Sequence, residues 1–190
     1  ALQLEQISVL TAADQFKENG EFRQAIDLLK RGLSLFPENV DMLSLLSHCY
    51  ILSAQPEEAK VYLSKAKAIT PENASVGWNT ARLMLLKQRA FEALKVARQT
   101  TQRYPNDVEG MGVLGACLRA NNRITDSMEV LNRAIELKPN YAEALINRGL
   151  IQLSQNNKTE ALADLELAHR SKPHIRQIWD LVISLKIEAQ

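Results

Sequence analysis

Prolines recur at a fixed spacing along this chain of 190 residues. Five of the six lie 34 residues apart with no insertion: Pro37, Pro71, Pro105, Pro139 and Pro173. Proline lacks a backbone N–H and disfavours the helical conformation in the residue before it, so each is expected to end a helix. Pro56 falls instead where a helix is expected to begin, a place where proline is tolerated. The spacing therefore predicts a repeated helix–turn–helix unit.

Small and large side chains keep the same 34-residue register. The eighth, twentieth and twenty-seventh positions of each unit carry small residues, because two helices approach closely only where side chains are short. The eighth positions are Ala13, Ser47, Ala81, Gly115 and Gly149, and the twentieth are Ala25, Ala59, Ala93, Ser127 and Ala161. Asn-Gly and Asn-Asn pairs lie between the expected helices, where turns are needed.

This combination of period, small positions and prolines resembles the tetratricopeptide repeat (TPR) family over about 170 of the 190 residues. The resemblance implies an all-α fold: a right-handed superhelical solenoid of antiparallel helix pairs, with a concave groove lined chiefly by the first helix of each pair. The expected repeats are 6–39, 40–73, 74–107, 108–141 and 142–175. Residues 176–190 are expected to form a C-terminal capping helix or a truncated sixth repeat.

Charge and hydropathy exclude several classes of function. The chain carries 23 basic and 22 acidic side chains, which are interleaved, so no basic stripe for nucleic acid is present. No apolar stretch reaches the roughly 18 residues that a membrane span requires. The chain begins at Ala1 without methionine, so we expect a fragment or a processed product.

Residues typical of catalysis or metal binding are scattered rather than clustered. The three histidines have no metal-ligand spacing, and no glycine-rich phosphate loop occurs. Cys49 and Cys117 occupy equivalent positions two units apart, too far for a disulfide. We therefore expect neither an enzyme nor a bound cofactor or metal, and we favour a cytoplasmic location, with which the cysteines are compatible.

The resemblance places the groove-facing side chains at positions 2, 5, 9 and 12 of each unit, which form one helical stripe. We expect the groove residues to be Asp14, His48, Trp78, Arg82, Arg119, Ile146 and Leu150. Asp14, His48 and Arg82 form either part of a ligand site or a surface ion ladder. Trp78 is either an exposed anchor for a partner or a residue that packs beside Gly77. The cationic residues with which some TPR domains clamp the C-terminal carboxylate of chaperones are missing from every window of three repeats.

The last helix has more apolar residues than a terminal cap requires. Val182 and Ile183 are expected to pack back on the preceding unit, which leaves Ile178, Leu181 and Leu185 as a second apolar stripe. This stripe predicts either a cut through a sixth repeat or an interaction surface, self-association included.

Taken together, the sequence predicts a scaffold that binds a peptide or a protein segment in its groove. Two alternatives stay open. The chain is the repeat region of a larger enzyme, such as a glycosyl-, sulfo- or methyltransferase whose catalytic domain lies elsewhere, or it is a self-assembling structural protein. The fold itself does not decide between them.

Overall fold

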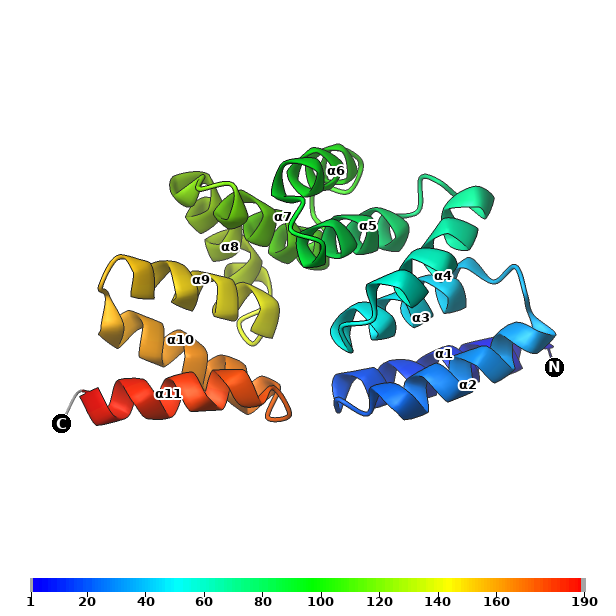
Figure 1. Ribbon diagram of the computed structural model, residues 1–190, viewed down its shortest axis with the longest axis horizontal. Coiled ribbons are helices and arrows are strands. Elements are labelled where there is room, and N and C mark those ends of the chain that lie inside the picture. Colours follow the sequence, from blue (N-terminus) through cyan, green and yellow to red (C-terminus); the bar gives the residue numbers. More distant parts are fainter. Residues whose placement is uncertain (1, 189–190) are drawn as a thin grey trace. The chain divides into compact units, whose positions relative to one another are not determined.

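The computed structural model describes residues 2–188, and every regular element in that range is an α-helix (Figure 1). The helices are α1 (Leu2–Glu18), α2 (Phe22–Leu35), α3 (Val40–Leu52), α4 (Pro56–Ile69), α5 (Ala74–Leu86), α6 (Ala90–Arg103), α7 (Val108–Ala120), α8 (Ile124–Leu137), α9 (Ala142–Ser154), α10 (Lys158–Ser171) and α11 (Arg176–Glu188). The all-α fold class predicted from the sequence is confirmed.

The helix boundaries repeat with the period of the prolines. From α3 onward the odd-numbered helices begin at residues 40, 74, 108, 142 and 176, and the even-numbered helices begin at 22, 56, 90, 124 and 158. We call the odd-numbered helices A-helices and the even-numbered helices B-helices. Each A-helix from α1 to α9 is followed by a residue with positive φ. These residues are spaced 34 apart: Gly20, Ala54, Gln88, Asn122 and Asn156. This left-handed residue turns the chain into the B-helix.

Polar side chains cap several A-helices at the last position of the preceding unit. The side-chain oxygens of Asn39, Asn73 and Asp107 accept backbone N–H groups at the starts of α3, α5 and α7. Such a cap satisfies donors that have no partner inside the helix. Tyr141 occupies the equivalent place before α9 and makes no side-chain cap, so that its ring is available for packing elsewhere.

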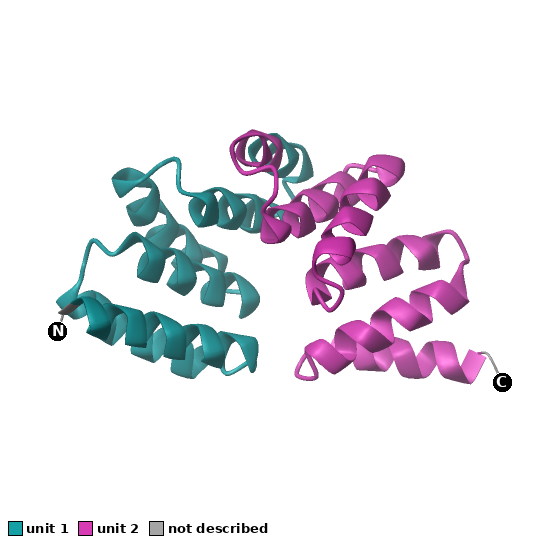
Figure 2. Cartoon of the chain, turned by 180° about the vertical axis from the view of Figure 1, so that it is seen from behind, with its two compact units in different colours: residues 1–96 teal, residues 97–190 magenta. Residues whose placement is uncertain are grey.

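The chain divides into two compact units, residues 1–96 and 97–190, and the division falls within α6 (Figure 2). In unit 1, α1 packs against α2 and α3, and α3 packs against α4 and α5. Its core holds small residues such as Ala13, Ala25 and Ala59 beside Leu29 and Leu63. The small residues let A- and B-helices approach, and the leucines fill the space between them.

Unit 2 is built in the same way. Its A-helices α7 and α9 pack against each other, and each also packs against its B-helix, α8 or α10; α11 packs against α10. Gly115 of α7 lies so close to the side chain of Leu131 in α8 that an added Cβ would collide with it. The eighth position of the 34-residue repeat therefore sets the separation of the paired helices.

Candidate functional site

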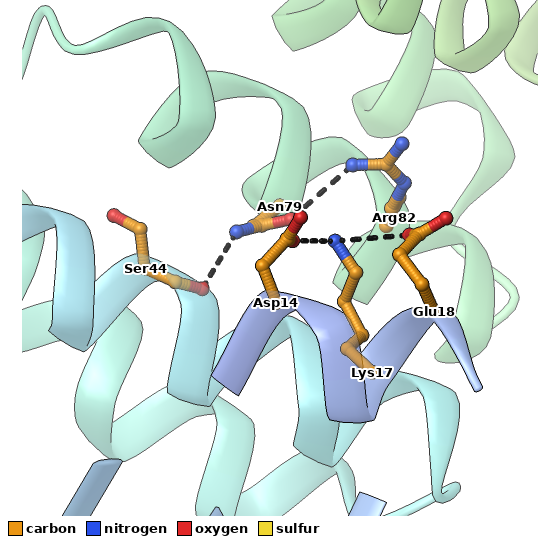
Figure 3. A network of polar contacts seen from close by, with 6 residues as sticks. All are labelled: Asp14, Lys17, Glu18, Ser44, Asn79 and Arg82. Carbon is orange, nitrogen blue, oxygen red and sulfur yellow. Dashed lines mark hydrogen bonds and ion pairs between the residues drawn. The ribbon is translucent and has the colours of Figure 1, made fainter. Parts of the chain in front are cut away.

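The candidate site residues lie on the A-helices and are described for each unit separately. In unit 1, Asp14 of α1 is exposed, while His48 of α3 and Arg82 of α5 are half-buried. Asp14 forms an ion pair with Lys17 at 2.6 Å between Oδ1 and Nζ, and Lys17 also lies 3.4 Å from Glu18 (Figure 3). We call Asp14, Lys17, Glu18, His48 and Arg82 the A-helix face of unit 1.

A buried asparagine organises the cationic end of this face. The Nδ2 of Asn79 donates to the backbone carbonyl of Ser44 at 2.9 Å, and this bond ties α5 to α3 (Figure 3). Its Oδ1 accepts a hydrogen bond of 3.3 Å from the Nη1 of Arg82. The amide oxygen therefore orients the guanidinium of Arg82.

An arginine in unit 2 also donates to a buried asparagine, but here the two residues lie on different helices. Arg119 of α7 is half-buried, and its Nε donates to the Oδ1 of Asn147 in α9 at 3.1 Å. Ile146 and Leu150 of α9 are also half-buried. We call Arg119, Ile146, Asn147 and Leu150 the A-helix face of unit 2.

The helical stripe in the sequence predicts the two arginines as site residues but does not include the asparagines that hold them. Asn79 and Asn147 lie 68 residues apart, and each occupies the sixth position of its 34-residue repeat. The available signal was an asparagine that recurs at a position where two other repeats carry the apolar Leu45 and Val113. The stripe of positions 2, 5, 9 and 12 passes beside this position and therefore omitted it.

The structure corrects the prediction that Trp78 is an exposed anchor. Its side chain is wholly buried, with a relative exposure of 0%. Of the two interpretations drawn from the sequence, the packing one agrees with this burial.

The structure also corrects the prediction for the last helix. Ile178 and Leu185 of α11 are buried at 4% and 7% exposure, and Leu181 is partly buried against the same core. The large hydrophobic side chains that α11 exposes are Trp179, Ile183 and Ile187. The helix is thus rotated relative to the expected orientation: Val182 packs inward as predicted, but Ile183 faces outward. The three residues of the predicted interaction stripe belong mainly to the core.

Arg148 of α9 has an ion-pair partner inside unit 2. Its Nε and Nη2 donate to the two carboxylate oxygens of Asp164 in α10, both at 2.7 Å. Its Nη1 donates to Asn132 of α8 at 2.8 Å. The hydrogen bond with Asp164 is the main reason that the pKa of Arg148 is raised. The guanidinium therefore links α9 to α8 and α10.

The structure also bears on the cysteines, on metal binding and on membrane spans. Both cysteines are buried with free thiols, and burial raises the pKa of Cys49 to about 12, so its nucleophilic thiolate is disfavoured. Within residues 2–188 no group of three or more His, Cys, Asp or Glu side chains could hold a metal ion. No helix in the described range has the length and apolarity to cross a membrane.

Comparison with known proteins places these helices in a family. Two family models match, described as "Tetratricopeptide repeat" over residues 17–83 and "TPR repeat" over residues 115–156. A thermophilic TPR protein of Thermus thermophilus superposes with a TM-score of 0.80 at 17% identity, covering 96% of this chain and 99% of that one. A TPR protein of Parabacteroides merdae gives a TM-score of 0.76 at 17% identity, covering 94% of this chain and 70% of that one.

Curated relatives share the sequence pattern over part of their length. Protein FlbA of Caulobacter vibrioides is 23% identical over 82% of this chain and 26% of its own length. The Hsp70-Hsp90 organizing protein 1 of Glycine max is 21% identical over 88% of this chain and 28% of its own. The Drosophila melanogaster homologue of BBSome complex member BBS4 is 22% identical over 85% and 33%. The chain thus spans a third or less of these relatives. With its 34-residue helix pairs, both family matches and these structural neighbours, the chain belongs to the tetratricopeptide repeat family.

Proposed function

We propose that this chain is a protein-interaction module that binds a segment of a partner protein along the A-helix faces of its repeats. The observation that carries the proposal is the arginine held by a buried asparagine, which occurs once in each unit. An amide oxygen is neutral, so it orients the guanidinium without itself supplying a negative charge. Arginine is also enriched among the residues that dominate protein–protein binding energy.

The neighbouring side chains and the relatives support the same proposal. Ile146 and Leu150 lie half-buried on α9 beside Asn147, so the A-helix face of unit 2 combines apolar surface with a cation. This combination suits a peptide better than a small polar metabolite. Two of the relatives carry names that refer to protein assemblies, the Hsp70-Hsp90 organizing protein and a BBSome complex member. Binding of a protein segment is therefore the function that we assign to the A-helix faces.

The test is a selection of random phage-displayed peptides on the chain, followed by NMR mapping of the bound face. We expect enriched peptides to shift the backbone amides of α3, α5, α7 and α9 more than those of the B-helices. Arg82→Ala or Arg119→Ala should weaken binding by about tenfold, the loss of roughly 1.4 kcal/mol.

A matched control uses Arg98, which is exposed on the B-helix α6. Arg98→Ala removes the same charge from the other helix series and should leave the affinity unchanged. Failure to enrich any peptide over the bare matrix would refute the proposal, and so would amide shifts confined to the B-helices.

A further inference from the structure

Arg119 differs from the other half-buried arginine of unit 2 in what surrounds its charge. Arg148 is paired through two bonds of 2.7 Å with the carboxylate of Asp164. The Nε of Arg119 donates to the neutral amide oxygen of Asn147 at 3.1 Å. No carboxylate among the described residues forms an ion pair with it, and burial is the one influence on its pKa, which is lowered. A desolvated guanidinium without an anion is unfavourable, so an acid that reached it would be bound strongly.

Lack of acidic residues does not explain this unpaired charge. The chain has 22 of them, and even exposed arginines have partners, as in the pairs Arg89–Glu92 and Arg123–Asp126. Glu143 lies one helical turn before Asn147 on α9, but its Oε2 accepts the hydroxyl hydrogen of Tyr141 at 2.8 Å. The fold thus supplies an acid to other arginines and a neutral amide to Arg119.

The bond to Asn147 also fixes the orientation of the guanidinium. The Nδ2 of Asn147 donates to the backbone carbonyl of Glu143 at 2.8 Å, which leaves its Oδ1 to face Arg119. With Nε engaged, the two Nη groups remain to bind an oxygen pair, and a guanidinium is planar, so they lie in one defined plane. Asn147 itself is buried, so this positioning does not depend on a mobile surface side chain.

Short side chains precede Arg119 on α7. Ala116, three residues before Arg119 on α7, has a short side chain, and Gly112 lies one turn further back. The ring of Tyr141 covers Gly112 so closely that an added Cβ would meet it at 2.6 Å. Leu150 lies three residues after Asn147 on α9 and is half-buried. Ala116 and Leu150 are therefore the short and the apolar neighbour of Arg119 and Asn147 along their own helices.

We propose that Arg119, positioned by Asn147, binds the side-chain carboxylate of an Asp or Glu within the partner segment. This assignment rests on the proposed peptide-binding function and adds the chemistry of one contact. A single guanidinium matches a single negative charge, whereas a phosphate group usually recruits several arginines. A terminal carboxylate would need the additional cations that the sequence lacks at the clamp positions, so the acid is internal to the segment.

The test uses the selected peptide that binds the A-helix face of unit 2 most tightly. Each Asp and Glu of the peptide is changed in turn to Asn or Gln, and affinities are measured by fluorescence anisotropy against wild type, Arg119→Gln and Asn147→Asp. We expect one acidic residue to account for about tenfold in affinity with the wild type and for no more than about twofold with Arg119→Gln. The peptide with an amidated C-terminus should bind as well as the free acid.

Asn147→Asp separates positioning from structural support. The substitution keeps the shape of the side chain and gives Arg119 an internal carboxylate. We expect the folded state to be retained, as judged by circular dichroism, while affinity falls by about tenfold and no longer depends on the acid of the peptide. Arg98→Gln serves as the control for net charge.

Different results separate this inference from the proposed function. If peptides map to the A-helices but show no preference for an acid, or if Asn147→Asp binds as well as wild type, the carboxylate contact is wrong and the peptide-binding function stands. Loss of binding on amidation would also refute it, in favour of a terminal carboxylate. If no peptide maps to the A-helices, both proposals fail.

Discussion

Two buried serines occupy positions where the other repeats carry alanine or glycine. The hydroxyl of one has no hydrogen-bond partner, and the hydroxyl of the other has one. The Oγ of Ser47 finds no hydrogen-bond partner among residues 2–188, although Ser47 is fully buried in α3. The Oγ of Ser127 donates to the backbone carbonyl of Gly115 at 2.7 Å. A buried hydroxyl without a partner is unfavourable, whereas a bonded one contributes to stability.

We therefore expect Ser47→Ala to raise the free energy of unfolding by about 1 kcal/mol, because it removes an unsatisfied polar group where Ala13 and Ala81 stand in neighbouring units. Ser127→Ala should lower it by about 1 kcal/mol, because the bond to Gly115 is lost. Urea denaturation followed by circular dichroism measures both. Changes of the same sign in the two variants would contradict this account of the hydroxyls.

At the scale of helix pairs, glycine at position 8 decides how closely A- and B-helices pack. A Cβ at Gly115 would collide with the side chain of Leu131 in α8, whereas at Gly149 it would lie 3.0 Å from the Cγ of Leu165 in α10. We expect Gly115→Ala to destabilise the protein by about 1–3 kcal/mol, since a tightly packed neighbour must move. Gly149→Ala should cost less, because the overlap is smaller and alanine favours the helix by about 1 kcal/mol. Equal losses in thermal denaturation would refute the argument from separation.

The last helix offers a matched pair of isoleucines for testing its orientation. Ile178 is buried against α10 at 4% exposure, and Ile183, on the same helix, is exposed at 38%. We expect Ile178→Ala to lower the free energy of unfolding by about 2 kcal/mol or more, and Ile183→Ala to change it by under about 0.5 kcal/mol. Urea denaturation of the two variants decides the point. A larger loss for Ile183→Ala would restore the orientation expected from the sequence.

At the scale of the whole molecule, a repeat protein loses stability first near the change, because each repeat contacts only its neighbours. Replacing Asp164 by Ala leaves the half-buried Arg148 without its carboxylate, which costs about 3–5 kcal/mol for a buried pair. We expect amide hydrogen exchange to accelerate in α8 to α10 of unit 2 and to change little in α1 to α4 of unit 1.

The exposed pair Arg123–Asp126 of α8 supplies the control for this experiment. Asp126→Ala removes an ion pair that both partners expose to solvent, so exchange should stay close to that of the wild type. Equal acceleration across both units in Asp164→Ala would show that the chain unfolds as one cooperative body, contrary to the expectation for a repeat architecture.

Local features of the sequence determined the helices, their order and their register. Proline and the turn residues act on their own backbone, so their positions mark where helices end without reference to the rest of the fold. The spacing of Pro37 and Pro71 equals that between the starts of α3 and α5. The same helical stripe placed Arg82 and Arg119 on the A-helices, since that placement requires only the helical period.

Tertiary contacts decided what those side chains touch. α11 has two apolar stripes, and only its packing against α10 selects the one that contains Ile178 and Leu185. Trp78 is of a residue type that often anchors a binding partner, yet the surrounding fold buries it. Arg119 and Asn147 meet although 28 residues separate them, and Arg148 meets Asp164 on another helix. Whether an arginine is neutralised depends on such distant neighbours, because burial and pairing are properties of packed helices and are not properties of the helical period.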